Sequence, residues 1–306
     1  MRYDPLQLAA LSAVLDLGSF DAASAALGVT PSAISQRIKA LEDRIGTPLV
    51  NRSSPCTGTE TGLRIAKHAE DVALLERRLS RDLSLEGAET PARLKLAVNA
   101  DSLATWFVKA MVAAGDVLFD LVIDDQDHST DWLRRGVVSA AVSAEPRPVA
   151  GCDVHALGHL RYVATASPAY MARWFPGGVT PETASVAPCM VFNAKDRLQH
   201  RWLARHVAPG LTPPSHALSS TQAFLDAAAG GLGWGMNPET LAEPHLASGA
   251  LVELVPQSPL ETPLYWHVSR IMAPALVEIT QAVRRAASAN LHPPPKAPNA
   301  RAGRGG

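Results

Sequence analysis

The sequence predicts an α+β protein of several domains, in which a helical N-terminal module and one long helix precede a larger α/β part. Three observations support this prediction. Residues 1–60 are alanine-rich and helical in pattern, with turn signals at glycines. Residues 63–85 contain neither proline nor glycine. From about residue 92 onward, short apolar runs alternate with helical stretches, which is typical of an α/β architecture.

The composition narrows the class of protein. The 306 residues suffice for two or three domains, and a formal net charge of −1 argues against bulk polyelectrolyte binding while allowing local basic patches. Three widely separated cysteines predict neither a disulfide framework nor a cysteine zinc site. There is no signal-type cleavage site and no apolar run long enough to cross a bilayer. We therefore expect a cytoplasmic protein without membrane contact.

Residues 20–42, "FDAASAALGVTPSAISQRIKALE", predict two short helices joined by a tight turn at Gly28. Thr30 is a good N-cap, and Pro31 suits the first helical position, where its missing N–H has no intrahelical partner to lose. The residues of the second helix expected to face the core are Ile34, Ile38 and Leu41. This pattern is that of a helix-turn-helix. An alanine-rich helical hairpin that only packs is the alternative.

The outward face of the second helix has the chemistry of DNA recognition. Small side chains allow the helix to enter the major groove, and Gln36 can pair with a base edge. Lys39, Arg37 and Arg52 can neutralise phosphates. The predicted DNA-binding residues are Ser32, Ser35, Gln36, Arg37, Lys39 and Arg52.

The long segment after residue 60 predicts one coiled-coil-like helix, which usually needs a partner helix. Its apolar residues recur at spacings of four and three, and they are Ile65, Ala69, Val72, Leu79 and Leu83, with Leu75 close by. The stretch "EGAETPAR" that follows predicts a hinge. Residues 61–91 are thus expected to form a linker helix and hinge.

Three strand-to-helix junctions of the α/β part carry polar side chains. The first is "LAVNADSLATW" from residue 96, the second "LVIDDQDHS" from residue 121, and the third "LSSTQAFLDAA" from residue 218. Ligands of open α/β folds bind outside the carboxyl ends of strands. The predicted ligand-binding residues are Asn99, Asp101, Ser102, Thr105, Asp124, Asp125, Ser220 and Thr221.

The mixture of groups at these junctions favours a basic L-amino acid as the ligand. The helix expected to begin near Ser102 offers free backbone N–H groups to a carboxylate. Asp101 can hold an α-ammonium or a side-chain cation, and the Asp124–Asp125 pair adds negative charge. A solvated acidic loop and a simple serine N-cap are the structural alternatives.

The quoted segments also resemble a known family. "SFDAASAALGVTPSAISQRIKALEDRIGTPLVNR" is similar to the DNA-binding module of LysR-type transcriptional regulators. "PCTGTETG" resembles that family's wing, with Gly58 in place of the more usual apolar residue. "AVNADSLATW", "DDQDHS", "GLGWGM", "PLYWH" and the "SPC" after Arg52 resemble its ArgP/LysG branch.

The resemblance implies a winged helix-turn-helix in residues 1–60 and a dimerisation helix in 61–91. It also implies a periplasmic-binding-protein-like effector domain in 92–292. Its lobe 1 is expected at about 92–163 and 267–292, lobe 2 at about 164–266, and a disordered tail at 293–306. It further implies a DNA operator, homodimers that assemble into tetramers, and RNA polymerase as a further candidate partner. The implied effector is lysine or arginine, with no other cofactor, and the implied target is an amino-acid exporter gene. The residues leave open which of the two amino acids is preferred, and whether the effector is another small molecule.

Enzymatic activity is not expected. The sequence has no GxSxG elbow, HExxH helix or Walker loop. The glycine-rich "GGLGWG", from residue 230, follows a helix and precedes a strand, the reverse of the dinucleotide-binding order. Gly158 separates His155 from His159, so no metal site is expected there. A stand-alone amino-acid-binding protein would lack the first ninety residues and would carry an export signal.

Overall fold

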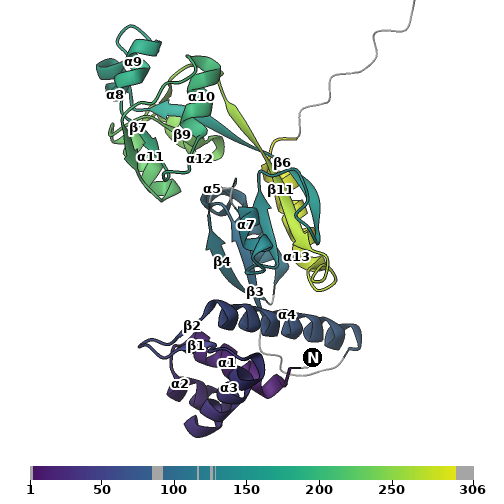
Figure 1. Cartoon of the computed structure of the whole chain (residues 1–306). Helices are drawn as coiled ribbons and strands as arrows, with labels where there is room; N and C mark the ends of the chain where they lie inside the picture. The colour runs from purple at the N-terminus through teal and green to yellow at the C-terminus, as the bar shows by residue number, and fades with distance from the viewer. Residues whose placement is uncertain (1–2, 85–91, 116, 125–126, 128, 294–306) are drawn as a thin grey trace, which may run out of the picture.

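The computed structural model describes residues 3–84, 92–115, 117–124, 127 and 129–293. It shows a helical N-terminal module, the long helix α4 and a two-lobed part (Figure 1). The predicted tail falls almost entirely outside the described residues, as does Asp125.

The helices are α1 Pro5–Leu17, α2 Phe20–Leu27, α3 Pro31–Ile45, α4 Glu60–Asp82, α5 Ala100–Ser102, the π-helix η1 Leu103–Phe107, α6 Val108–Ala114, α7 Ser129–Arg134, α8 Pro168–Trp174, α9 Pro181–Val186, α10 Leu198–His206, α11 Thr221–Ala229, α12 Glu239–Ala247 and α13 Val277–Asn290. The strands are β1 Val50–Asn51, β2 Thr57–Gly58, β3 Ala92–Val98, β4 Val117–Ile123, β5 Ala140–Ser143, β6 Cys152–Ala166, β7 Cys189–Val191, β8 Ser215–Ala217, β9 Gly235–Pro238, β10 Val252–Glu253 and β11 Leu260–Ser269.

The N-terminal module packs α1, α2 and α3 around one apolar core. Leu11 and Val14 of α1 are fully buried in the cluster that also holds the three predicted core residues of α3. These three are Ile34, Ile38 and Leu41. The one-face apolar pattern of α3 therefore predicted its packing correctly.

Helix α4 connects this module to the two-lobed part. Its N-terminus packs closely on the chain before the wing, because a Cβ on Gly62 would lie 1.9 Å from the Leu49 carbonyl oxygen. Farther along, Leu74 is buried in the core cluster of the two-lobed part. Leu79 and Leu83 are each 59% exposed in the single chain. The end of α4 thus leaves two large apolar side chains in solvent.

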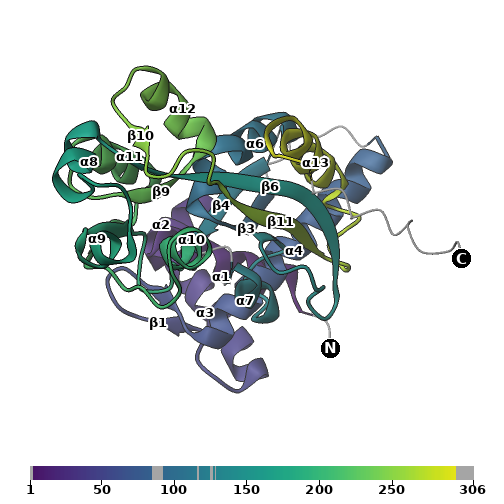
Figure 2. The ribbon, with the colours of Figure 1, turned by 90° about the horizontal axis from the view of Figure 1, so that it is seen from above.

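A sheet of seven strands is the frame of the two-lobed part, in the order β10-β6-β11-β5-β3-β4, with β9 paired to β6. Strand β3 is parallel to β4 and to β5, as the apolar runs predicted. We define lobe 1 as β3, β4, β5 with α5, η1, α6, α7 and α13, and lobe 2 as β7 to β10 with α8 to α12. Helices α6 and α13 lie side by side in lobe 1 (Figure 2).

The antiparallel strands β6 and β11 run from one lobe to the other. Residues Tyr162–Thr165 of β6 pair with β9 of lobe 2, and residues Tyr265–Val268 of β11 pair with β5 of lobe 1. The two strands pair with each other along the whole of β11, from Leu260 opposite Tyr162 to Ser269 opposite Cys152, with a register shift between Leu264 and Tyr265. The lobes are therefore linked by a continuous two-stranded ribbon.

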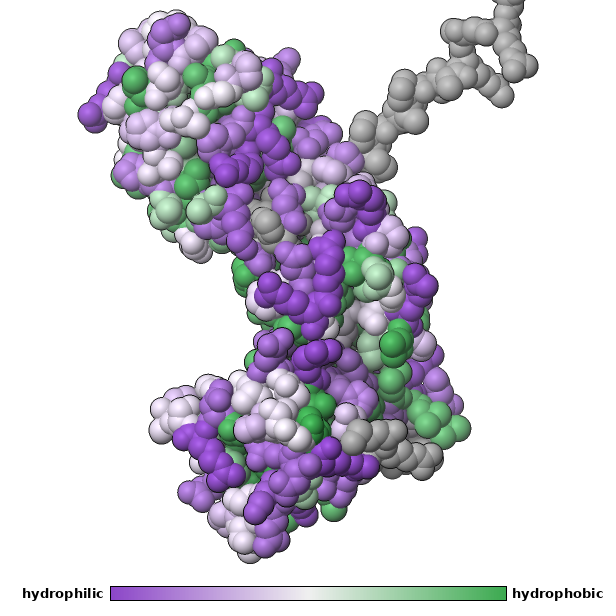
Figure 3. Space-filling model, viewed as in Figure 1, coloured by the Kyte–Doolittle hydropathy of each residue, from purple (hydrophilic) through white to green (hydrophobic). Residues whose placement is uncertain are grey.

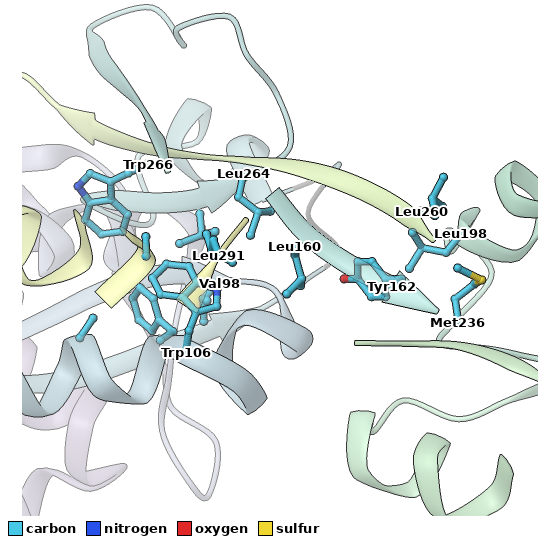
Figure 4. Close-up of a cluster of buried hydrophobic side chains, with 14 of the residues drawn as sticks. Val98, Trp106, Leu160, Tyr162, Leu198, Met236, Leu260, Leu264, Trp266 and Leu291 are labelled. Atoms are coloured by element: carbon cyan, nitrogen blue, oxygen red, sulfur yellow. The ribbon is translucent and has the colours of Figure 1, made fainter. Parts of the chain in front are cut away.

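One hydrophobic cluster continues along this ribbon (Figure 4). Trp106 and Trp266 lie at its lobe 1 end, Leu160 and Leu264 in the middle, and Met236 at its lobe 2 end. The face of the molecule seen in Figure 3 is mostly hydrophilic, with small separate hydrophobic patches. Among the described residues, no helix combines the length and the hydropathy that crossing a membrane requires.

Candidate functional sites: a helical surface and an interlobe pocket

The turn at Gly28 and the Thr30 cap of the predicted helix-turn-helix are present, and Ser19 adds an N-cap to α2. The Ser19 hydroxyl accepts a hydrogen bond from Ala22 N at 3.4 Å, and Gly28 closes α2 with φ of 63°. The Thr30 hydroxyl accepts from Ala33 N at 3.2 Å, and Pro31 is the first residue of α3. These caps fix the turn. Because Ile34, Ile38 and Leu41 face the core, the opposite face of α3 is left to solvent.

That solvent face carries the predicted DNA-binding side chains. Ser32, Gln36 and Lys39 are exposed, whereas Ser35 and Arg37 are half-buried at its edges. Arg52 is exposed beyond β1, and its guanidinium carbon lies 5.1 Å from the centre of the Phe20 ring. The stacking holds this cation beside the start of α2.

The wing, β1 and β2, explains the unusual glycine at position 58. A Cβ on Gly58 would lie 2.8 Å from Leu63 of α4 and 3.2 Å from Leu15 of α1. The neighbouring leucines thus fill the space that an apolar side chain at residue 58 would use. The Asn51 amide donates to Gly58 O and to Thr57 Oγ1 across the hairpin, both at 3.3 Å.

A pocket lies between the two lobes, where the structure brings together predicted residues from all three junctions. The space between its lining residues measures about 450 Å³, open solvent included. Four of the predicted residues line it, and they are Asn99, Asp101, Asp124 and Thr221. Residues from lobe 1 and lobe 2 therefore face one another across this space.

Asp101 is at the centre of a hydrogen-bond network in this pocket. Its Oδ1 accepts from the Thr221 hydroxyl at 2.7 Å, and its Oδ2 accepts from the Tyr162 hydroxyl at 2.8 Å. Burial raises the pKa of the Asp101 carboxyl, and the charge of Asp196 raises it further, while the two hydrogen bonds act in the opposite direction. Both carboxylate oxygens are thus engaged by groups of the protein.

Asp124 lies at the second junction, directly after β4. Its Oδ2 accepts from Trp132 Nε1 at 2.9 Å, and its Oδ1 lies 3.4 Å from Lys195 Nζ of lobe 2. The indole fixes the orientation of the carboxylate. Its predicted neighbour Asp125 lies outside the described residues.

Three predicted residues lie near the pocket but do not line it. The Thr105 hydroxyl donates to Asp101 O at 2.6 Å, and exposed Ser220 caps α11 by accepting from Ala223 N at 3.3 Å. Ser102 is fully buried, and its hydroxyl has no hydrogen-bond partner within the described part of the chain. The helical run begins at Ala100, two residues before the predicted start, so Ser102 lies inside its first turn.

The sequence reasoning missed two polar residues of the pocket, Asp196 and Asn237. Asp196 is buried in the loop after β7, where Oδ2 accepts from Phe192 N at 2.8 Å and Oδ1 from Leu198 N at 2.9 Å. Asn237 is buried near the end of β9, and its amide donates to Thr165 Oγ1 at 2.9 Å. Both are near strand ends, so the rule that identified Asn99 could have found them.

Comparisons with known proteins match both the N-terminal module and the two-lobed part. A family model described as the LysR substrate binding domain matches residues 87–288. A second model, described as bacterial regulatory helix-turn-helix protein, lysR family, matches residues 6–63. The HTH-type transcriptional regulator LysG of Mycobacterium bovis is 45% identical over 287 residues, which is 94% of each chain.

The chain also resembles solved structures over nearly its full length. The crystal structure of ArgP from Mycobacterium tuberculosis has a TM-score of 0.78 and 43% identity, and the match covers 96% of this chain and all of the other. Full-length LysG from Corynebacterium glutamicum with bound effector Arg has a TM-score of 0.65 and 36% identity. That match covers 95% of this chain and 100% of the LysG chain.

Proposed function

The chain belongs to the LysR family of transcriptional regulators, and on that premise we propose that its interlobe pocket binds a basic L-amino acid, lysine or arginine, as effector. The family and the similar proteins are DNA-binding transcriptional regulators and not enzymes.

One observation carries the choice of effector. Three carboxylates, those of Asp101, Asp124 and Asp196, line the same pocket. Its described lining contains no lysine, arginine or histidine, and the nearby cation given above is the Lys195 ammonium, 3.4 Å from Asp124 Oδ1. A cationic side chain gains charge-assisted hydrogen bonds at such a site, whereas a second carboxylate on the ligand would be repelled. A dicarboxylic amino acid is therefore disfavoured.

The start of the lobe 1 helical run suits the carboxylate that every amino acid carries. Asn99 and Ala100 line it at the point where the helical run Ala100–Ala114 begins. Backbone N–H groups in a first turn have no intrahelical acceptor and attract an anion. We therefore assign the α-carboxylate to the backbone N–H groups of this first turn, and the positive groups of the ligand to the acidic side chains.

The LysG structure with bound Arg supports this assignment, because that chain is 36% identical to this one over nearly the full length. It does not choose between lysine and arginine for this protein. A guanidinium can pair with a carboxylate through two parallel hydrogen bonds, and an ammonium cannot.

We propose that α3 reads a partly palindromic operator. Gln36 pairs with a base edge, and the small side chains of Ser32 and Ser35 let the helix enter the major groove. Arg37, Lys39 and Arg52 contact phosphates in this proposal, which predicts strongly salt-dependent binding. The exposure of Lys39 and Arg52 supports this role.

Exposed Leu79 and Leu83 support residues 61–91 as the dimerisation segment, because a second helix would cover them. In the proposal, residues 1–60 bind DNA, residues 92–292 bind the effector, and dimers assemble into a tetramer. Effector binding stabilises one relative placement of the lobes and so changes the spacing of the DNA-binding modules. We place the protein in the cytoplasm, at an amino-acid exporter gene, with RNA polymerase as a further partner.

Isothermal titration calorimetry of the full chain tests the effector assignment. The panel is lysine, arginine, glutamate and phenylalanine. We expect binding of lysine or arginine and none of glutamate, because the carboxylates repel it. Operator binding without response to either basic amino acid would leave a LysR-family regulator with a different effector and overturn the proposal.

A further inference from the structure

We propose that Lys195 is a built-in competitor of the effector: its ammonium occupies the cation position at Asp124 and must leave before the effector's side-chain cation can pair there. Lys195 would then set the effector concentration to which the protein responds. The inference rests on the proposed function and concerns regulation of the same pocket.

The position of Lys195 supports this role. Its Nζ lies 3.4 Å from Asp124 Oδ1, and the other oxygen of Asp124 is already engaged by Trp132. The Asp124 side chain is only 16% exposed and lines the pocket. Lys195 comes from the loop after β7 in lobe 2, so its ammonium reaches across to lobe 1. The ammonium of Lys195 thus already occupies the position at Asp124 that is proposed for the effector's side-chain cation.

The backbone that carries Lys195 is firmly held. Asp196 accepts hydrogen bonds from Phe192 N and Leu198 N, and Lys195 N donates to Asn193 Oδ1 at 2.8 Å. By contrast, the Lys195 side chain is 51% exposed. The ammonium can therefore move into water while its loop stays in place.

The contact is also weak enough to be displaced. Its 3.4 Å separation exceeds the usual length of a charge-assisted hydrogen bond, and exposed lysine pairs contribute little. A guanidinium can form two such bonds with a carboxylate, whereas free lysine replaces one ammonium by another. The competition therefore favours arginine over lysine.

The test compares the wild-type chain with Lys195→Met, which keeps a long side chain and removes the charge. The matched control is Lys109→Met, an exposed lysine of lobe 1 whose Nζ bonds to Asn290 Oδ1 at 2.6 Å, outside the pocket lining. Each chain is titrated calorimetrically with arginine, lysine and citrulline, the last being an uncharged analogue of arginine. The titrations are repeated at low and high salt.

We expect Lys195→Met to bind arginine and lysine about threefold more tightly than wild type, as expected for loss of one exposed ion pair. Citrulline binding should not change, because it cannot use the position that Lys195 leaves. In wild type one cation replaces another at Asp124, so affinity should depend little on salt; in Lys195→Met it should fall as salt rises. Lys109→Met should match wild type throughout.

Unchanged or weaker arginine binding by Lys195→Met would overturn the inference, and weaker binding would show that Lys195 closes the lobes over the ligand. Binding by Lys195→Met but not by wild type would support it strongly. Failure of both chains to bind either basic amino acid would overturn the proposed function as well. If wild type binds a basic amino acid and Lys195→Met binds it with the same affinity, this inference alone is overturned and the proposed function stands.

Discussion

The Thr221 hydroxyl donates a 2.7 Å hydrogen bond to the Asp101 carboxylate, and this bond joins lobe 2 to lobe 1 across the pocket. Thr221 is the first residue of α11, while Asp101 lies in the first turn of the lobe 1 helical run. Tyr162, on the ribbon between the lobes, holds the other oxygen of the same carboxylate. Asp101 thus couples the ligand space to the relative placement of the lobes.

Replacing Thr221 with valine keeps the shape of this buried side chain and removes the interlobe bond. We expect effector affinity to fall about tenfold, the usual contribution of a hydrogen bond to a charged group. Asp101→Asn should weaken binding at least as much, because it also removes the charge. Calorimetric titration with arginine measures both effects.

The control for this pair is Asp226→Asn, on the exposed side of α11, where the carboxylate accepts from Gln222 Nε2 at 3.0 Å. It should bind arginine as wild type does, and all three variants should keep wild-type operator affinity without effector. Wild-type arginine affinity in both Thr221→Val and Asp101→Asn would contradict the assignment of the pocket.

Gln36→Ala should reduce discrimination between the operator and random DNA. A bidentate contact to a base contributes about 1–3 kcal/mol of specificity, which is lost with the amide. Lys39→Ala is the matched comparison, because loss of a phosphate contact weakens both DNAs alike and reduces the salt dependence. Fluorescence anisotropy with both DNAs at several salt concentrations distinguishes the two. Unchanged discrimination in Gln36→Ala would show that another face of α3 reads the bases.

Gly62→Ala should destabilise the DNA-binding module. The new Cβ would lie 1.9 Å from the Leu49 carbonyl oxygen, so α4 or the preceding chain must move. Overpacking of this kind costs about 1–3 kcal/mol or more. Gly177→Ala is the control, since a Cβ added at that glycine would meet no atom within 4 Å among the described residues. Equal thermal unfolding midpoints for the two variants would contradict the close packing at Gly62.

Glu70 predicts a pH dependence of stability. Burial raises the pKa of its carboxyl from 4.5 to about 7; Lys67 and Lys95 oppose the rise, and Asp16 and Asp120 add to it. The stabilisation from the protonated carboxyl is fully present below the unfolded pKa of 4.5, and it is lost as pH rises through about 7. Glu70→Gln stays neutral, so it should match wild type near pH 4 and exceed its stability near pH 8, by on the order of 2 kcal/mol.

Denaturant unfolding at several pH values measures this difference. Exposed Glu76→Gln, on the same helix, serves as the control and should follow the wild-type profile. A constant difference between Glu70→Gln and wild type across the range would show that Glu70 ionises normally in the folded protein.

The local elements were predictable because their signals are local. Thr30, Pro31 and Gly28 define the ends of the helix-turn-helix, and the apolar runs of β3, β4 and β5 predicted a parallel sheet. The strand-end rule placed Asn99, Asp101, Asp124 and Thr221 in one pocket, although they are far apart in sequence.

The remaining features depend on contacts between distant residues. Tyr162 has the pattern of an ordinary strand residue, and only the crossing of β6 between the lobes brings its hydroxyl to Asp101. The sequence suggested Thr105 as a ligand donor, yet its hydroxyl bonds to the backbone one turn earlier. Lys195 and Asp124 are separated by 71 residues, so nothing near either one indicates their contact.

A crystal structure of the full chain with L-arginine is the most direct test of the central claim. We predict one arginine between the lobes, with its side-chain cation at the carboxylates of Asp101, Asp124 or Asp196 and its α-carboxylate at the helix start beside Asn99. Arginine bound elsewhere, or in this pocket with its carboxylate toward the acidic residues, would contradict the account.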